Sequence, residues 1–445
     1  MHIFRILVFI LYCAIHLNGK QVIQLNTIDS TLIKQNLDSL IKHSKNLTTE
    51  YRLISYQLNP DSATYFQHSA YKQPDTLFAV SHDPIKKKTL DQIISPLRLV
   101  DIGKDIKPAL KKIRNHYYFL TKTPDYQLGI LNKDQLGLFI NIRPEFQSHF
   151  SGLVGAVQNI DKSWNLTGEM DFHLENIWQT AGEINIYWQK LDSASQTLKI
   201  QMYEPHPFGW MLGTDLSYSY EIFNGLFTDT KTNVAWQIPG FTFGSLYLGY
   251  VSGKITPSSK GELGGYLPSR FQGLLVSFKH NSHNRRFLPN LGSKLDLGTD
   301  IGTQDDVVYI QAEIEADHYF SLSENWNIVT SIWGKMINLD HDNVPEPRKV
   351  RFGGINRLRG YRDQEFSADA VSIPTLALQY LPSMYWRTEF FIDMALIKAL
   401  DHIPIGLGFG FSQLTDDAVI QVQYALSKGN NLLGGKLHIY WISRL

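Results

Sequence analysis

Arg359, Gly360 and Tyr361 stand in succession within a long polar stretch between two strand-like segments. The arginine guanidinium is a rigid fork of five donors, which suits it to pairing with a carboxylate or with carbonyl groups in a confined space. Upstream, Gly353 and Gly354 let the backbone turn tightly or adopt a positive φ. We predict a loop that is pinned inside a hollow structure; an exposed basic turn is the alternative.

Catalytic signatures are missing from the sequence, which contains neither His-Glu-x-x-His nor Gly-x-Ser-x-Gly. Gly253-Lys254 lacks the first glycine and the Ser or Thr of a phosphate-binding loop. Gly406, Gly408 and Gly410 alternate along a predicted strand with no helix after it, which disfavours nucleotide binding. We therefore expect no enzyme activity and no cofactor.

His280 and His283 flank a predicted turn among other polar residues. A metal site is one interpretation of this pair. Neither histidine has an acidic partner at a fixed spacing, so ordinary surface or lumen histidines are the better interpretation, and we predict no bound metal.

The composition excludes some classes of function and leaves others open. The 445 residues carry 42 basic and 42 acidic side chains and the pI is near 7.3, so we expect no nucleic-acid partner. Aromatic residues make up 12% of the chain, the mean hydropathy is −0.19, and no run outside the N-terminus is apolar enough for a spanning helix. This combination is typical of alternating strands with aromatic girdles in a membrane, and it is also compatible with a soluble all-β protein.

Residues 1–19 have the pattern of an export signal. Arg5 supplies a positive charge, Ile6–Leu17 is nearly all apolar but too short to span a bilayer, and small residues precede a cut near Lys20. The single cysteine, Cys13, lies within this signal. The mature chain would then have no disulfide and no thiolate metal site.

A small α+β module is predicted at residues 75–145, after an N-terminal segment at residues 20–74 that has helical spacing from Gln21 to about Ser44 and is otherwise unassigned. The module's expected elements follow from periodicity and from the turn sequence Asn132–Asp134. They are a strand, two helices and a strand pair, at Thr76–Val80, Lys86–Ile94, Gly103–Leu120, Tyr126–Leu131 and Gln135–Arg143.

After Pro144, alternating segments of about ten residues recur to the end of the chain. We expect strands at Ser148–Val157, Trp164–Glu175, Ala181–Leu191, Ser195–Glu204, Trp210–Glu221, Thr230–Ile238, Phe241–Ser252, Phe271–Asn281, Ser293–Gly302, Asp306–His318, Asn325–Ile337, Val371–Leu381, Tyr385–Ile397, Ile403–Ser412, Ala418–Ser427 and Gly435–Arg444. The even number, 16, lies within the range of outer-membrane barrels. We therefore predict a mainly β chain, in which residues 146–445 form a 16-stranded antiparallel transmembrane barrel.

The links between these strands support a membrane barrel. If the first strand runs outward, the two longest links, Gly253–Arg270 and Asn338–Ala370, are external, and most periplasmic links are short. Ser282–Gly292 is the exception among the periplasmic links. In the last strand, Leu437, Ile439 and Trp441 share one side, as a lipid-facing surface requires, and a soluble β-sandwich is the alternative.

The Arg-Gly-Tyr tip resembles a feature of a known family. The chain is similar to the BamA/TamA-type superfamily of outer-membrane assembly and translocation barrels, in which periplasmic POTRA modules precede a 16-stranded barrel. The resemblance implies that Arg351–Tyr361 is the sixth extracellular loop, whose tip folds back into the barrel lumen. It also implies that Asp393, which follows Phe391 as in the family's Phe-x-Asp-x-Gly strand, faces Arg359.

Other positions match the family less closely. Ala395 stands where that strand has glycine, and Gln379 is the best candidate for the acidic residue that often joins the pair from the preceding strand. Tyr203–Gly209 resembles the family's Glu-Pro turn after the fourth strand, and Pro289–Gly292 resembles its Pro-x-x-Gly turn before the ninth. The final residue, Leu445, replaces the usual terminal aromatic.

The resemblance implies a function without reaction chemistry. The expected role is an insertase or translocase in the bacterial outer membrane, with the N-terminal module in the periplasm and a lateral seam between the first and last strands. Gly434 and Gly435 would weaken the last strand at that seam. The expected partners are client outer-membrane or secreted proteins, accessory subunits and membrane lipid. A secretion pore for one dedicated substrate, a passive porin and a structural β-protein are the alternatives.

Overall fold

The computed structural model describes residues 22–43, 49–69, 72–102, 105–131, 135–158, 164–192, 194–239, 243–340, 343–354, 357–397, 402–431 and 434–445. The expected signal at residues 1–19 and the turn Asn132–Asp134 lie outside this set. None of the described helices has the length and apolar character needed to cross a membrane. The described chain divides into two compact units, one of residues 1–80, 93–110 and 125–142, the other of residues 81–92, 111–124 and 143–445.

The N-terminal part of the first unit is a three-stranded sheet in the order β1-β3-β2 with one helix. Its elements are β1 (Val22–Leu25), α1 (Ser30–His43), β2 (Thr49–Leu58) and β3 (Asp61–Ser69). The expectation of helix from Gln21 onward is wrong over β1, because Val22–Leu25 pairs with β3 and buries Ile23 and Leu25. Helical spacing alone gives no information on a partner strand that lies about forty residues away in the sequence.

The following residues form the predicted α+β module, with a sheet in the order β4-β6-β5. Its elements are β4 (Thr76–Ser81), α2 (Lys87–Ile94), the 3-10 helix η1 (Ser95–Leu99), α3 (Lys107–His116), β5 (Asp125–Leu131) and β6 (Gln135–Ile142). The expected start of the second helix, Gly103, lies outside the described residues; the described helix begins at Lys107, where the Asp105 side chain accepts a hydrogen bond from the Lys107 amide (3.0 Å).

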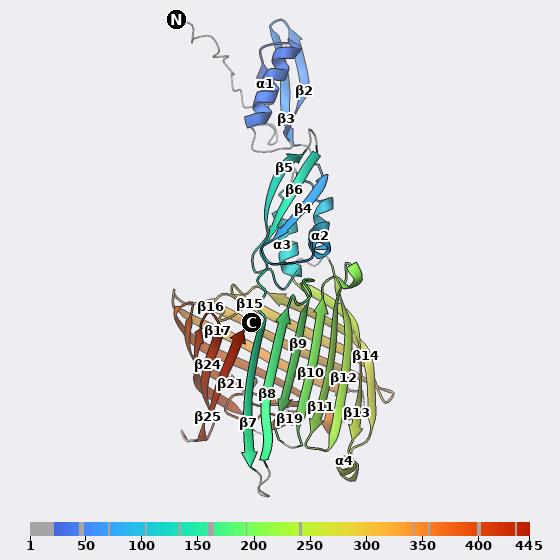
Figure 1. The fold of residues 1–445 in the computed structure, drawn as a ribbon, viewed down its shortest axis with the longest axis vertical. Helices are drawn as coiled ribbons and strands as arrows, with labels where there is room; N and C mark the ends of the chain where they lie inside the picture. The colour runs from blue at the N-terminus through green and yellow to red at the C-terminus, as the bar shows by residue number, and fades with distance from the viewer. Residues whose placement is uncertain are drawn as a thin grey trace. The chain divides into compact units, whose positions relative to one another are not determined.

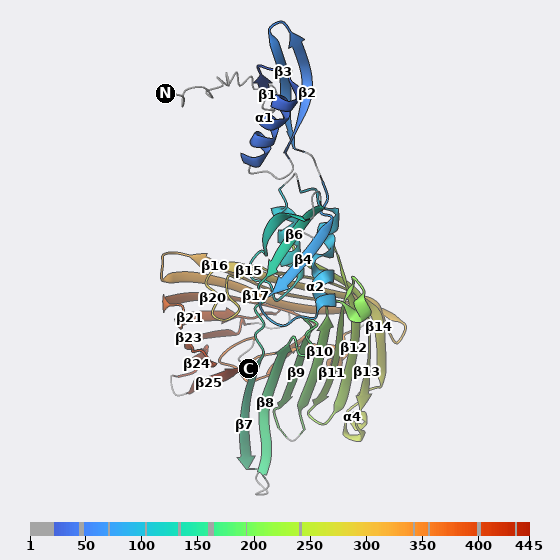
Figure 2. The same cartoon turned by 45° about the horizontal axis from the view of Figure 1, so that its top comes forward.

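The second unit is dominated by a closed antiparallel barrel (Figures 1 and 2). Its strands are β7 (His149–Gln158), β8 (Trp164–Glu175), β9 (Glu183–Lys190), β10 (Gln196–Glu204), β11 (Gly213–Phe223), β12 (Phe227–Ile238), β13 (Ser245–Pro257), β14 (Ser269–Asn281), β15 (Gly292–Gln304), β16 (Val307–Ser321), β17 (Trp326–Leu339), β20 (Ala370–Ser383), β21 (Trp386–Met394), β22 (Leu396–Ile397), β23 (Ile405–Leu414), β24 (Ala418–Ser427) and β25 (Lys436–Arg444). Because β21 and β22 are one strand interrupted at Ala395, the barrel has 16 strands, which confirms the predicted fold.

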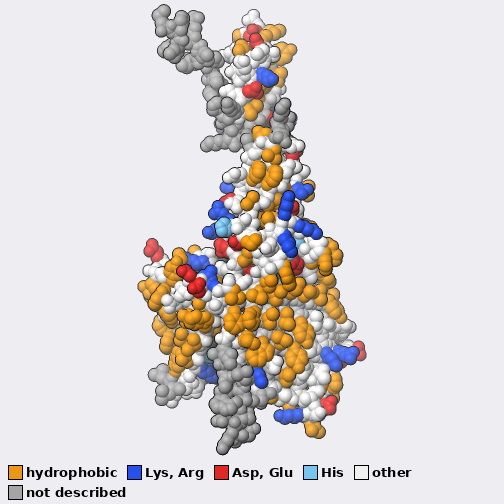
Figure 3. Space-filling model, viewed as in Figure 1, with side chains coloured by type: hydrophobic (Ala, Val, Ile, Leu, Met, Phe, Trp, Pro, Cys, Tyr) orange, Lys and Arg blue, Asp and Glu red, His pale blue; other side chains and the backbone are white. Residues whose placement is uncertain are grey.

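The outer wall of the barrel is apolar, whereas the inner wall carries polar and charged side chains together with apolar residues such as Phe271 and Trp333. In β25, Leu437, Ile439 and Trp441 are between half and two-thirds exposed, as expected for side chains that face lipid. In Figure 3, hydrophobic side chains cover much of the visible wall. The long external link between β13 and β14 carries a short helix, α4 (Ser259–Leu263).

Residues 81–92 and 111–124 belong to the barrel's unit and contact turns between its strands. The Gln92 amide donates to the Gly209 carbonyl (2.6 Å), and the Tyr117 hydroxyl pairs with Nε2 of His206 (2.9 Å) in the Tyr203–Gly209 turn. Burial lowers the pKa of His206, and it lowers the pKa of His116 to about 4. Both imidazoles are therefore neutral near pH 7, so the contact contains no unpaired buried charge.

Candidate functional site

The sixth external link, residues 340–369, is packed among inward-facing side chains of the barrel. It contains the 3-10 helix η3 (Glu346–Arg348) and a two-stranded sheet of β18 (Val350–Phe352) and β19 (Phe366–Ala368). One buried apolar cluster joins this link to five barrel strands, through Val350, Phe352, Leu358 and Ala368 of the link and Val251, Phe271, Tyr309, Trp333 and Ile373 of the wall. The link is therefore held in place by burial of apolar surface as well as by charge.

The turn of this loop depends on glycine. Gly353 and Gly354 have φ values of 128° and 80°, and Gly360 has a φ of 92°. These values lie in the left-handed region that side chains other than hydrogen rarely adopt. A Cβ atom at Gly360 would also lie 2.6 Å from the Leu426 carbonyl carbon, so the loop tip lies directly against the backbone of β24.

Arg359 binds Asp393 of β21 through both ends of its guanidinium fork. Nε donates to Oδ2 (2.8 Å) and Nη2 donates to Oδ1 (2.7 Å), while the Arg359 amide donates to Oδ2 (3.1 Å). Thr375 of β20 donates a further hydrogen bond to Oδ1 (2.8 Å). Asp393 is 0% exposed, so this carboxylate depends on these four donors in place of water.

The guanidinium of Arg359 has two further partners on the same strand. Its Cζ atom lies 3.3 Å from the centroid of the Phe391 ring, in cation–π geometry. Its Nη1 atom lies 3.6 Å from Oε1 of Glu389. Glu389, Phe391 and Asp393 alternate along β21 and share its inner face, so one arginine contacts three consecutive inward positions.

Gln379 lies in the site but is not the partner that the sequence predicts. Its amide donates to Oε2 of Glu389 (3.0 Å), and Gln423 donates to Oε1 of the same carboxylate (2.9 Å). The second acidic residue near Arg359 is therefore Glu389, on the strand of Asp393 rather than on the preceding one. One feature of the sequence could have identified Glu389. It lies four residues before Asp393, a spacing that places both side chains on one face of a strand.

The glycine-rich strand β23 provides room for the loop tip. A Cβ atom at Gly406 would overlap the Arg359 carbonyl oxygen, so only glycine permits this approach. Next to it, the Tyr361 hydroxyl accepts a hydrogen bond from the Ile405 amide (3.2 Å). Gly406 therefore serves packing between a strand and the loop, whereas Gly408 and Gly410 lie against the neighbouring strands β24 and β21.

Three more arginines connect the loop to other parts of the wall. Arg351 donates to Glu221 of β11 (2.9 Å), and Arg357 donates to Glu315 of β16 (3.1 Å). The guanidinium of Arg348 is buried 3.8 Å from the ring centroid of Phe271 in β14. Sequence reasoning missed these contacts, because each joins residues that lie far apart in the chain with no shared motif.

Gly434 and Gly435 precede β25, which begins at Lys436. A Cβ atom at Gly435 would overlap the Tyr424 hydroxyl, so this glycine allows close packing against β24. The residues of β25 that pair with β7 are at the opposite end of the strand, Ile442–Arg444. The two glycines therefore lie away from the ladder that closes the barrel.

His280 and His283, the two histidines that flank the predicted turn, have protein partners. His283 bonds Oδ1 of Asp317 (2.6 Å) through Nε2, so it has the acidic partner that the sequence did not reveal, and Nδ1 of His280 bonds the Phe243 carbonyl. Among the described residues, His173, Glu175 and Glu183 have donor atoms close enough together for a metal ion. The Arg286 guanidinium already binds both oxygens of Glu175, so that carboxylate is neutralised by a cation of the chain itself.

Comparison with protein-family models supplies the deciding observation. Residues 162–398, more than half of the chain, match the Omp85 superfamily domain. This chain belongs to the Omp85 superfamily. Comparison with curated protein sequences gives no match.

Solved structures of Omp85-like architecture share the fold at low sequence identity. BamA from Haemophilus ducreyi lacking POTRA domains 1–3 is 12% identical, with a TM-score of 0.54 over 93% of each chain. CdiB from Escherichia coli is 12% identical, with a TM-score of 0.57 over 94% of this chain and 84% of that chain. CdiB from Acinetobacter baumannii is 12% identical, with a TM-score of 0.56 over 93% of this chain and 81% of that chain. This Omp85 protein is thus an outer-membrane-type β-barrel that follows a POTRA-like α+β module.

Proposed function

We propose that this Omp85 protein inserts or translocates client proteins through a lateral seam between β25 and β7. The observation that carries the proposal is the length of the closing ladder. Within the described residues it has three residue pairs, Ile442–Ser151, Ser443–Phe150 and Arg444–His149. The neighbouring ladders are longer, with 8 pairs between β24 and β25 and 10 between β7 and β8.

A short ladder matters because backbone groups in lipid have no water to bind. Each unsatisfied group costs several kcal/mol in the hydrocarbon region, so the unpaired parts of β7 and β25 favour any partner that offers a strand edge. An incoming extended segment pairs with such an edge by β-augmentation. The same edge therefore supports both roles, because a strand of a client barrel and an extended segment in transit present the same backbone groups.

A cavity of about 270 Å³ lies at this seam, which gives an incoming segment space beside the strands. Its lining includes Ser151 and Gly152 of β7, Leu437 and Trp441 of β25, and Asp363 of the sixth loop. The sixth loop thus extends from the Arg359–Asp393 contact to the seam, and we propose that the Arg359 contact fixes the loop in this position.

A passive porin fits these features less well than a transporter of polypeptides. The sixth loop fills part of the lumen with the apolar cluster around Leu358, which argues against a wide and steady aqueous pore. A secretion pore for one dedicated substrate remains the alternative to an insertase. Depletion of the protein followed by quantitative outer-membrane proteomics separates the two, because loss of many barrel proteins indicates an insertase and loss of one secreted protein indicates a dedicated pore.

A disulfide across the seam tests the proposal directly. Ser151 and Ile442 lie directly opposite each other in the closing ladder, so the double substitution Ser151→Cys and Ile442→Cys places two thiols within bonding reach. In cells that depend on this copy, we expect client levels to fall under oxidising conditions and to recover with reductant. The matched control is Gln421→Cys with Tyr440→Cys, across the long β24–β25 ladder. Equal client levels in the oxidised seam variant and the control would contradict a lateral seam.

A further inference from the structure

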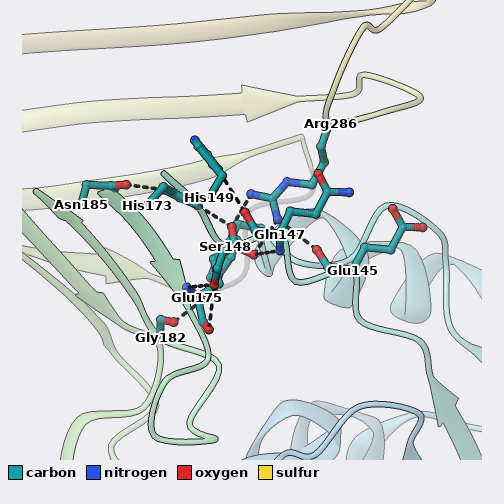
Figure 4. Close-up of polar contacts among 10 residues, drawn as sticks. Glu145, Gln147, Ser148, His149, His173, Glu175, Gly182, Asn185 and Arg286 are labelled. Atoms are coloured by element: carbon teal, nitrogen blue, oxygen red, sulfur yellow. Dashed lines mark hydrogen bonds and ion pairs between the residues drawn. The ribbon is translucent and has the colours of Figure 1, made fainter. Parts of the chain in front are cut away.

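The link between β14 and β15, residues 282–291, is the longest periplasmic link between described strands. β7 and β14 are the first and eighth strands of the ring, so they lie half-way round the barrel from each other. Figure 4 shows Arg286 of this link beside the residues that lead into β7. A contact between the link and the start of β7 therefore crosses the periplasmic mouth of the barrel.

Arg286 makes a two-pronged ion pair at this place. Nη1 donates to Oε2 of Glu175 (2.8 Å), and Nη2 donates to Oε1 of the same carboxylate. Nη1 also donates to the backbone carbonyl of Glu145 (3.0 Å), which precedes β7. The Glu175 side chain is 0% exposed, so the pair is shielded from water and salt.

Glu175 transmits this contact to the start of the first strand. Its Oε2 accepts a hydrogen bond from the Gln147 amide (2.8 Å), and its own amide donates to the Ser148 hydroxyl (2.9 Å). His173 bonds Oε1 (2.6 Å) and Asn185, which fixes the carboxylate from the other side (Figure 4). The backbone carbonyl of Ser148 in turn accepts a hydrogen bond from the amide of Leu445 (2.9 Å), the last residue of the chain.

Phe287, the next residue of the link, touches both strands of the seam. Its ring packs edge-on against His149 of β7, with a centroid distance of 5.7 Å. The guanidinium of Arg444 in β25 lies 5.8 Å from the centroid of the same ring. His149 and Arg444 are themselves register partners in the closing ladder, so the link contacts the last pair of that ladder from the periplasmic side.

We propose that Arg286 and Phe287 form a periplasmic latch that holds the seam closed. The latch rests on the proposed function, because it assigns regulation to the same seam. Arg286 acts as a positioning residue: through Glu175 it fixes residues 145–148, and these lead directly into the three ladder pairs. Release of the latch frees the start of β7 and raises the population in which β7 and β25 separate. The closing ladder has few backbone pairs of its own. Its stability therefore depends strongly on the contacts of Arg286 and Phe287.

Amide hydrogen exchange of the purified full-length protein measures this population without any client. Exchange at the seam amides, on peptides covering residues 148–152 and 441–445, follows the fraction of molecules in which the seam is open. We expect Arg286→Ala to raise that exchange rate about tenfold, which corresponds to about 1.4 kcal/mol and lies near the low end for charge-assisted hydrogen bonds. Exchange in the β15–β16 ladder, which has 13 pairs, should stay unchanged and serves as the internal control.

The matched control variant is Arg285→Ala, which removes the same charge from the same link. Arg285 has no hydrogen bond or ion pair among the described residues, so its loss should leave seam exchange at the wild-type rate. Glu175→Gln keeps the size of the side chain and removes the ion pair, and it provides the same comparison should Arg286→Ala fail to fold. We expect Glu175→Gln to raise seam exchange as well.

Two results would overturn the latch. One is seam exchange in Arg286→Ala and Glu175→Gln that equals that of wild type and Arg285→Ala. The other is a uniform rise across all ladders, which would make Arg286 a residue of general stability. Neither result bears on whether clients pass through the seam, because no client is present. Conversely, normal client levels with an oxidised seam disulfide would contradict the proposed function and leave the exchange result standing.

Discussion

The carboxylate of Asp393 shows how one buried charge makes a loop position specific. It is 0% exposed and accepts hydrogen bonds from the side chain and amide of Arg359 and from Thr375. A second carboxylate, Glu389, lies 3.6 Å from the same guanidinium. A single arginine therefore compensates two buried acidic groups, and any other position of the loop tip would leave both without a cation.

Arg359→Ala should destabilise the protein more than its lost contacts alone suggest. The substitution leaves Asp393 and Glu389 buried without a cation, and we expect a loss of about 3 kcal/mol in the free energy of unfolding. Adding Asp393→Asn should restore part of this loss, because it removes one of the two uncompensated charges. Urea unfolding of the folded barrel in lipid vesicles measures the difference.

The control for the Arg359→Ala and Asp393→Asn substitutions is Arg357→Ala in the same loop. Its partner Glu315 is 40% exposed and is also bound by Lys294, so the loss should stay within about 1 kcal/mol. Equal losses for Arg357→Ala and Arg359→Ala, or a double variant less stable than Arg359→Ala, would show that the Arg359–Asp393 pair is not the main electrostatic anchor of the loop.

Among the secondary-structure elements, β23 shows why one strand of the barrel wall requires glycine at Gly406. At Gly406 the backbone of the strand meets the backbone of the loop at Arg359, with no room for a side chain. Gly406→Val should therefore displace the loop tip and leave the barrel ladder closed, since overpacking costs about 1–3 kcal/mol and the tip is the part that moves more easily.

Brief trypsin treatment of intact cells that carry Gly406→Val should then cut at Arg357, Arg359 or Arg362. Gly298→Ala, at a strand position where a Cβ meets nothing within 4 Å, should leave the loop resistant. Resistance of Gly406→Val would show that the strand yields instead.

The secondary-structure elements also show what the sequence can and cannot predict. The barrel strands were predictable to within a few residues, because inside and outside alternate with a period of two along every strand. The pairing of Arg359 with Asp393 was predictable through a family motif, whereas Glu389 was missed because that motif places the second acidic residue on the preceding strand, where Gln379 stands. The helix expected from Gln21 was wrong over β1, because the partner strand determines that structure. No local pattern marks the Arg286–Glu175 pair, whose members are 111 residues apart. The unusual length of Ser282–Gly292 was its only signal.

For the whole molecule, the anchors of the sixth loop and the periplasmic latch act at opposite ends of the barrel. The loop binds β11, β16 and β21 through Arg351, Arg357 and Arg359 from the external side. The periplasmic link binds the start of β7 and the end of β25. The ladder between β7 and β25 has three described residue pairs, so the periplasmic link contacts the ring where few backbone pairs hold it closed.

If the sixth loop closes the lumen, its removal should turn the protein into an open pore. Replacing residues 345–367 by a short Gly-Ser link deletes the apolar cluster around Leu358 and all four anchoring arginines, while the hydrogen bonds between β17 and β20 remain. We expect single-channel conductance in planar bilayers to rise from a low and fluctuating level to a large and steady one, because the space that the loop fills becomes open to water. Arg359→Ala should give an intermediate result, with long openings on a low baseline, since the loop is retained without its strongest anchor. A wild-type conductance that is already as large and steady as that of the deletion would show that the loop does not close the lumen, and would favour a passive porin.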